Sequence, residues 1–231
     1  MLIKDSYLKN GRNEELNVII VDWSVYSDSR YYVARSKVSV VGEYVAQFVD
    51  WLHKEGQLKF ETLHLVGHSL GAHVVGFAGK NVMEGRIHII YGLDPASPLF
   101  SSSSDENRLG DNDGIYVETI HTNGAFKGFY QPVGKASFYL NGGRIQPGCG
   151  SDWDGVCSHA RSVIYFAEAI SSGKTNNFIP YKCEDYSSLK DDKCSVIAQG
   201  IYLASEDNFG NAYGIYSIKT HSSKCNRHYR Q

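Results

Sequence analysis

The chain has 231 residues, of which 42% are hydrophobic and 21% are charged, a composition typical of a folded globular protein. Lys and Arg number 23 against 25 Asp and Glu, so the formal net charge is −2. Such a chain has no long-range positive field to gather phosphate backbones, which argues against nucleic-acid binding. No stretch approaches the roughly 18 apolar residues of a transmembrane segment, so we expect none.

The first predicted element is a strand at residues 18–21, a run of Val and Ile. Continuous β-branched runs are typical of strands buried on both faces of a parallel sheet. A helix follows, because apolar residues then recur at intervals of three and four. This stripe consists of Val38, Val41, Val45, Phe48 and Leu52.

Strands and helices continue to alternate along the next part of the chain. Residues 62–66 predict a strand, residues 72–78 a short helix, and residues 87–91 a third strand that ends at residues 92–95. This order predicts an α/β fold with a mostly parallel sheet and right-handed crossovers.

The second half begins with a polar loop at residues 101–107, followed by a predicted strand at 115–121. Ser158 is then a candidate N-cap of a helix. One side of this helix is expected to carry Ala160, Val163, Ile164, Ala167 and Ile170. A last strand is predicted at residues 213–218. We see no repeat and no domain boundary, so residues 1–231 are expected to form a single domain.

The cysteines follow no zinc or redox spacing. They are Cys149, Cys157, Cys183, Cys194 and Cys225. The first two and the next two would form short disulfide loops and leave Cys225 without a partner. This pattern favours an oxidising compartment, although the first six residues lack the apolar core of a secretory signal.

Residues 67–71 fit the pattern G-x-S-x-G, with a predicted strand before it and a helix after it. A tight strand-to-helix turn would leave no room for a Cβ at Gly67 and Gly71 and would present the Ser69 hydroxyl to the crevice above the sheet. At the start of the helix, the amide of Leu70 is placed to donate to an oxyanion. The pattern predicts that Ser69 is a nucleophile.

A nucleophilic serine needs an imidazole base, and the imidazole needs an acid that fixes its tautomer. Asp94 closes the third predicted strand at the carboxyl end of the sheet, so it is the natural acid, while a turn former before Pro95 is the alternative interpretation. Among later histidines we choose His159, at the mouth of a helix and two residues from Cys157. His121 is expected to be structural.

The other histidines have less specific positions. His221 and His228 lie in a polar tail, where a solvated role is expected. His68 and His73 flank the nucleophile too closely in sequence to turn back upon it, and they are expected to line the turn around it.

These motifs together resemble the pancreatic lipase family, including its insect members and the related phospholipases A1. The matching segments are residues 67–73, 92–96, 120–122 and 157–159. The resemblance implies an α/β-hydrolase fold with helices on both faces of the sheet and no C-terminal β-sandwich domain. It also implies a secreted enzyme that hydrolyses carboxylic esters of lipids at a transient lipid interface, with Ser69, Asp94 and His159 as its triad and no cofactor.

Two loops that cover the site in this family are short here. The lid would be residues 150–156, only seven residues, which is too little to roof a pocket of some 300 to 1,000 Å³. Residues 125–140 resemble the second cover loop. In this family short covers accompany phospholipase A1 or galactolipase preferences, so we expect an open site and no strict triglyceride specificity.

The loop after Asp94 resembles a structural calcium site in several members of the family. The corresponding positions include Asp105, the backbone of Arg108, and Asp113, but Gly110 stands where an aspartate is expected. Because calcium prefers six to eight oxygen ligands, we predict no metal unless Asp111 moves in.

The family also carries an earlier strand that supplies a second oxyanion donor, and nothing before Val18 matches it. The chain therefore looks truncated at its N-terminus, with an open sheet edge. The alternative function is a non-catalytic lipid-binding relative that resembles the yolk proteins. A serine peptidase has no supporting feature beyond the triad.

Overall fold

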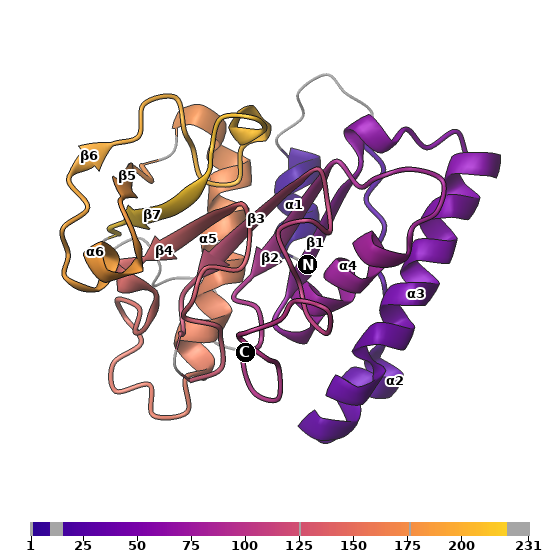
Figure 1. The fold of residues 1–231 in the computed structure, drawn as a ribbon, viewed down its shortest axis with the longest axis horizontal. Coiled ribbons are helices and arrows are strands. Elements are labelled where there is room, and N and C mark those ends of the chain that lie inside the picture. Colours follow the sequence, from indigo (N-terminus) through magenta and orange to yellow (C-terminus); the bar gives the residue numbers. More distant parts are fainter. Residues whose placement is uncertain (1, 10–15, 125, 176, 221–231) are drawn as a thin grey trace.

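The computed structural model describes residues 2–9, 16–124, 126–175 and 177–220. At its centre is a seven-stranded sheet with the order β1-β2-β3-β4-β7-β5-β6 (Figure 1). The strands are β1 (His64–His68), β2 (Ile89–Leu93), β3 (Tyr116–His121), β4 (Ala136–Leu140), β5 (Pro180–Cys183), β6 (Val196–Ile197) and β7 (Gly214–Ile218). Strands β1, β2, β3, β4 and β7 are parallel, whereas β5 and β6 extend the sheet with antiparallel pairs.

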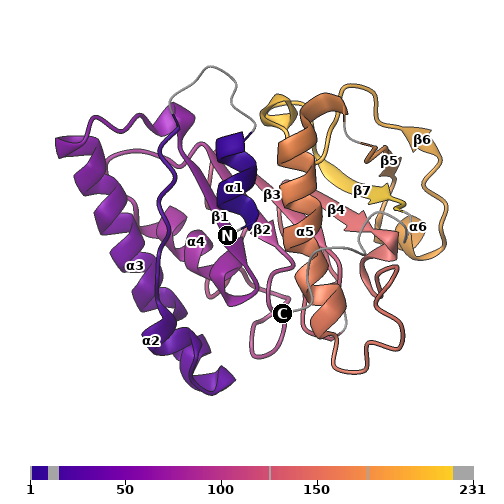
Figure 2. The same cartoon turned by 180° about the vertical axis from the view of Figure 1, so that it is seen from behind.

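Helices cover both faces of this sheet (Figures 1 and 2). On one face lie α3 (Tyr31–Glu55) and α4 (Leu70–Asn81), and on the other lie α1 (Leu2–Lys9) and α5 (Val156–Ser172). The remaining short elements are α2 (Ser24–Ser27), α6 (Tyr186–Lys190), η1 (Phe60–Thr62), η2 (Asn141–Gly143), η3 (Gly173–Thr175) and η4 (Glu206–Asn208). In the described part of the chain, no helix has both the length and the apolar character to cross a bilayer.

Alternating positions along β2 contribute to two hydrophobic clusters, one on each face of the sheet. On β2, Ile90 packs into the cluster that contains Val38 of α3 and Val75 of α4, whereas its neighbour Ile89 joins Phe166 of α5 on the other face. Strands buried on both faces read as continuous apolar runs, which is why β2 was recognisable in the sequence. The layered arrangement is the predicted α/β-hydrolase fold.

The predicted alternation of strands and helices from residue 62 onward is confirmed. The predicted stripe at residues 38–52 lies within α3, and its first three valines are buried. Phe48 does not follow them, because it is 39% exposed and Val49 is buried in its place. α3 and α4 approach closely at Gly42, where an added Cβ would lie 2.3 Å from Cβ of Phe77.

The predicted strand at residues 18–21 is wrong for this structure. Residues 16–23 have no regular secondary structure, and Ile19, Ile20 and Val21 are exposed. A strand exists only through hydrogen bonds to a neighbour, and within the described residues β1 pairs with β2 alone. A cavity of about 950 Å³ is lined both by this segment and by β1, so the two do not meet to form a ladder.

Three further predictions need correction. Ser158 is not the N-cap of its helix, because α5 already begins at Val156, and four of the five side chains expected on its apolar side are less buried than Tyr165 and Phe166. Part of the segment 125–140, expected to be a cover loop, is instead β4, which is completely buried in the sheet. The predicted last strand is confirmed as β7.

Candidate active site

Ser69 occupies a sharp turn between β1 and α4. Its backbone has φ 58° and ψ −121°, a left-handed conformation that is strained for a residue with a side chain. An added Cβ at Gly67 would lie 2.1 Å from the carbonyl oxygen of Gly71, so this position requires glycine. The sequence also led us to expect no room for a Cβ at Gly71. That expectation is wrong, because an added Cβ there meets no atom within 4 Å. Ser69 itself is half-buried and lines the 950 Å³ cavity.

Backbone hydrogen bonds fix this turn against the end of β2. The amide of Ser69 donates to the carbonyl of Leu93 at 3.0 Å, and the carbonyl of Ser69 accepts from the amide of Ala96 at 3.2 Å. Leu70 is the first residue of α4, so its N–H has no acceptor within the helix. The turn is thereby held beside Asp94, with the Leu70 amide available to a ligand.

Asp94 follows β2 and is completely buried. One carboxylate oxygen, Oδ1, accepts from the backbone amides of Thr122 at 2.8 Å and Asn123 at 3.1 Å. The other, Oδ2, lies 2.5 Å from Nδ1 of His159. A carboxylate that accepts three hydrogen bonds has its orientation fixed, and it selects the tautomer in which His159 carries its proton on Nδ1.

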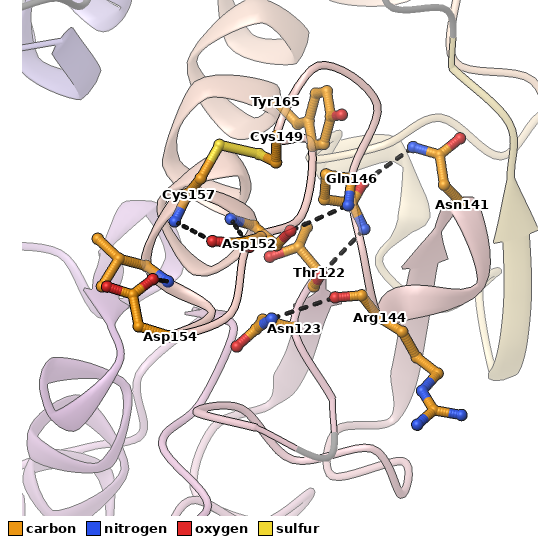
Figure 3. Close-up of a disulfide and its surroundings, with 12 residues drawn as sticks. Thr122, Asn123, Asn141, Arg144, Gln146, Cys149, Asp152, Asp154, Cys157 and Tyr165 are labelled. Carbon is orange, nitrogen blue, oxygen red and sulfur yellow. Dashed lines mark hydrogen bonds between the residues drawn. A yellow bond between two sulfur atoms is a disulfide. The ribbon is translucent and has the colours of Figure 1, made fainter.

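His159 lies in the first turn of α5. Figure 3 shows the loop that precedes this helix and holds its start. The carboxylate of Asp152 accepts from the amides of Cys157 at 3.0 Å and Ser158 at 2.8 Å, and so caps the helix. Burial alone would raise the pKa of Asp152, but these hydrogen bonds hold it below its ordinary value. The disulfide between Cys149 and Cys157 closes the loop, as predicted.

His68 connects the turn at Ser69 with the imidazole of His159. The centres of the two rings are 4.5 Å apart, and Nε2 of His68 lies 3.2 Å from the carbonyl oxygen of His159. Burial, and then the nearby His159, lower the pKa of His68 to about 4. His68 is therefore neutral near pH 7, and its Nε2–H donates to the carbonyl.

The remaining histidines have structural surroundings. His73 donates from Nε2 to the carbonyl of Ala96 at 2.7 Å and accepts at Nδ1 from the amide of Leu109 at 3.0 Å, while burial lowers its pKa to about 3. His121 is completely buried and contacts Thr119 and Phe129, in line with the expected structural role. The candidates His221 and His228 lie outside the described residues, as does Cys225.

The structure thus brings Asp94 and His159 into direct contact and places His68, the neighbour of Ser69, against His159. Sequence reasoning missed the supporting groups: the amides of Thr122 and Asn123, the cap formed by Asp152, and Gln146. The side-chain amide of Gln146 donates to the carbonyl of Thr122 (Figure 3), and the backbone amide of Gln146 donates to the hydroxyl of Ser158. No local pattern signals such contacts, because each joins segments distant in sequence.

In the loop that resembles a calcium site, Asp113 already bonds with other groups of the protein. Asp113 is contacted by Nζ of Lys80 and accepts from the amide of Gly110 at 2.8 Å. An added Cβ at Gly110 would lie 2.2 Å from the carboxylate of Asp105, so no larger residue fits in this arrangement. Among the described residues, no group of three or more His, Cys, Asp or Glu side chains is arranged to hold a metal ion.

The comparisons with known proteins agree on one family. The family model described as Lipase matches residues 3–226. A phospholipase A1 of Vespula maculifrons is 40% identical over 179 residues, 72% of this chain and 56% of that protein. The hepatic triacylglycerol lipase of Homo sapiens is 34% identical over 241 residues, 95% of this chain and 46% of that protein.

A third relative is named as an inactive protein. The inactive pancreatic lipase-related protein 1 of Homo sapiens is 39% identical over 203 residues, which cover 78% of this chain and 43% of that protein. The chain spans about half the length of the curated relatives it matches.

Proposed function

Because this chain belongs to the lipase family, we propose that it hydrolyses carboxylic esters of lipids, with Ser69, His159 and Asp94 as its catalytic residues. The observation that carries the proposal is the bond between Asp94 and Nδ1 of His159, next to a serine on a strained strand-to-helix turn. An oriented imidazole beside such a turn is the arrangement that serine acyl transfer requires.

The reaction follows from the roles of these groups. Nε2 of His159 takes the proton of the Ser69 hydroxyl while Oγ attacks the ester carbonyl carbon, and the Leu70 amide stabilises the oxyanion. His159 then gives the proton to the departing alcohol, leaving an acyl-enzyme. Water, deprotonated by His159, attacks the acyl carbon. The bond from this carbon to Ser69 Oγ then breaks, His159 returns the proton to Oγ, and the fatty acid leaves. Asp94 stays ionised and stabilises the imidazolium.

The substrate class is a finer part of the proposal. A disulfide joins Cys149 and Cys157, which are eight residues apart in the sequence. The loop that it closes is too short to roof the site. An uncovered site admits a bulky head group, which favours phospholipids as well as triglycerides. Two disulfides, the second between Cys183 and Cys194, favour a secreted protein.

The second candidate function is lipid binding without catalysis. It is favoured by one observation, that a relative of 39% identity is named inactive. Against it stands the set of polar contacts around Asp94 and His159, which a binding site for apolar ligands does not need.

Covalent labelling of the full chain with a fluorophosphonate probe separates the two functions. We expect stoichiometric labelling of the wild type and none of Ser69→Ala. A matched control is Ser103→Ala, which removes an exposed loop hydroxyl and should label as the wild type does. A folded wild type that takes up no label would favour the binding function.

A further inference from the structure

The outward side of α3 carries large apolar side chains, although the outward side of a surface helix is usually polar. The inward side of α3 lies in the core, where Val38, Val41 and Val45 are buried. The outward set, which we call the α3 stripe, consists of Val40, Tyr44, Phe48 and Trp51. A spacing of four, four and three residues places them on one side of the helix. Tyr44 is 67% exposed and Trp51 is 55% exposed, so α3 has a second apolar face that the described part of the chain leaves open.

The α3 stripe is a rigid surface of substantial area. The rings of Phe48 and Trp51 are stacked, with their centres 5.9 Å apart and their planes inclined by 18°. Aromatic side chains lose little conformational freedom on binding. The exposed parts of the four side chains amount to roughly 400 Å², since one aromatic side chain has about 150–250 Å² to bury. An apolar patch of about 300–600 Å² is the largest that a typical monomer exposes, and it is often functional.

The α3 stripe is separate from the candidate active site. α3 lies at the outer edge of the molecule, on the opposite side from β5 and β6 (Figures 1 and 2). Among the described residues that line the 950 Å³ cavity at Ser69, Val45 comes from the buried side of α3, and none belongs to the stripe. A partner bound to the stripe would therefore leave Ser69 accessible.

Two residues of opposite charge stand at the two ends of the stripe. Lys37 is three residues before Val40, and Glu55 is four residues after Trp51, so both lie on the same side of the helix as the stripe. Among the residues that the structure describes, neither Lys37 nor Glu55 forms a salt bridge. Both charges are thus available to a partner that packs along α3.

The other acidic and basic side chains of α3 have different surroundings. Arg35 lies over an aromatic ring, 4.7 Å from its centre. Asp50 accepts from two backbone amides of the loop after α4, and Nζ of Lys54 lies 2.8 Å from a carboxylate oxygen of Glu84 in that loop. Glu43 is exposed on the flank of the stripe. The charges in line with the stripe are therefore Lys37 and Glu55.

This pattern is complementary to itself when two α3 helices run antiparallel. About a two-fold axis between Tyr44 and Phe48, Tyr44 of one copy lies opposite Phe48 of the second, and Lys37 lies opposite Glu55. A parallel pair would instead bring equal charges together, which is unfavourable. Two stripes would bury about 800 Å², and the residues beside them bring the total to the roughly 1,000 Å² of a specific interface.

We propose that the α3 stripe is the interface of a homodimer, in which α3 packs antiparallel against α3 of a second copy. Trp51 is the main apolar anchor, and Lys37 and Glu55 set the orientation. The occupant is inferred from the opposite charges at the two ends of the stripe and from its area. The proposal concerns a surface apart from the candidate active site and does not rest on the proposed function.

The test measures the mass of the full chain by sedimentation equilibrium at several concentrations. We expect the mass to rise with concentration from that of one chain to that of two. Trp51→Ser should raise the dissociation constant of the dimer at least about a hundredfold, because each copy loses a large apolar contact. Trp153→Ser removes an exposed indole from the loop before α5, so it is the matched control and should not change the dissociation constant. Circular dichroism verifies that the variants are folded.

A charge reversal tests the antiparallel orientation. Lys37→Glu should weaken the dimer about tenfold, because it places two acidic side chains opposite each other at both ends of the interface. Lys37→Glu/Glu55→Lys restores opposite charges and should return the dissociation constant to within about twofold of the wild type.

Four results would each overturn the proposal. They are a wild-type chain that stays monomeric at about 100 µM, a dimer that Trp51→Ser leaves intact, an equal loss of dimer in Trp153→Ser, and a double charge reversal that dimerises no better than Lys37→Glu alone. None of these results bears on ester hydrolysis, which the fluorophosphonate label reports independently.

Discussion

At the scale of single residues, one neutral histidine outside the proposed triad, His68, contacts the candidate site. His68 is a positioning residue, because it contacts the ring and the carbonyl of His159 but has no place in the proton transfer. Its burial keeps it uncharged, so it would not repel the imidazolium that the proposed reaction forms on His159.

We predict that His68→Ala lowers kcat on a soluble ester about fivefold with little change in KM, since one oriented hydrogen bond is worth about 1 kcal/mol. His68→Gln restores a donor and should recover most of the rate. Urea unfolding of both variants separates this effect from a loss of stability. Equal rates in His68→Ala and the wild type would show that the contact has no part in positioning.

His73 gives a prediction about pH. Its folded pKa of about 3 lies below the ordinary value of 6.5, because burial disfavours the charged form and both ring nitrogens are already used. In the unfolded chain the ring takes up a proton as the pH falls below 6.5. The stability that neutral His73 contributes is therefore complete above pH 6.5 and is lost as the pH falls toward 3.

The measurement is the free energy of unfolding in urea at several pH values. The free energy of unfolding of the wild type, minus that of His73→Gln, should fall by several kcal/mol between pH 6.5 and the lowest pH at which both remain folded. His53→Gln is the control, since His53 is exposed on the last turn of α3. A difference that stays constant with pH would contradict the assignment.

At the scale of elements, local patterns predicted what short segments determine by themselves. The turn at Ser69 was recognisable because Gly67 must lack a side chain, and β2 because it is apolar throughout. Residues 18–21 have an equally strong strand pattern but no partner strand among the residues that the structure describes, and propensity cannot supply one. β4 was missed because its short, mixed sequence becomes a strand only between β3 and β7.

The same limit applies to the site. Asp94 and His159 could be paired from chain order, because Asp94 follows a recognisable strand and His159 lies at the start of a recognisable helix. The amides of Thr122 and Asn123 and the cap from Asp152 could not be predicted, since they depend on how three loops pack together. Long-range contacts of backbone groups leave no signature in the local sequence.

The two disulfides allow a prediction about the loop before α5. The paired cysteines are eight and eleven residues apart in the sequence, so the two closed loops have similar lengths. Serine substitution of either pair should therefore lower the free energy of unfolding by about 2–3 kcal/mol. Only the Cys149 and Cys157 pair holds the start of the helix that carries His159. Cys149→Ser/Cys157→Ser should therefore also lower kcat, whereas Cys183→Ser/Cys194→Ser should not. Equal kcat values for both double variants would show that the loop between Cys149 and Cys157 does not contribute to catalysis.

At the scale of the whole molecule, a buried carboxyl joins parts of the chain that are far apart. Glu118 on β3 accepts from the amide of Ala204, from the side chain of Asn208 and from the hydroxyl of Tyr116. Burial raises its pKa from 4.5 to about 7, although these three donors act in the opposite direction. The molecule therefore contains buried groups with opposite pH dependence, because Glu118 favours the folded state most when protonated and His73 when unprotonated.

The sign for Glu118 follows from linkage. Between pH 4.5 and 7 the folded state holds a proton that the unfolded chain has released, so this group lowers stability as the pH rises through that window. Replacement by Gln removes the titration. Relative to the wild type, Glu118→Gln should gain about 3 kcal/mol in free energy of unfolding between pH 4.5 and pH 7, whatever its stability at the lower pH. Urea unfolding across this range checks the slope, with Glu168→Gln on α5 as a carboxyl control. If the free energy of unfolding of Glu118→Gln minus that of the wild type does not rise between pH 4.5 and pH 7, Glu118 is ionised throughout and its three donors outweigh its burial.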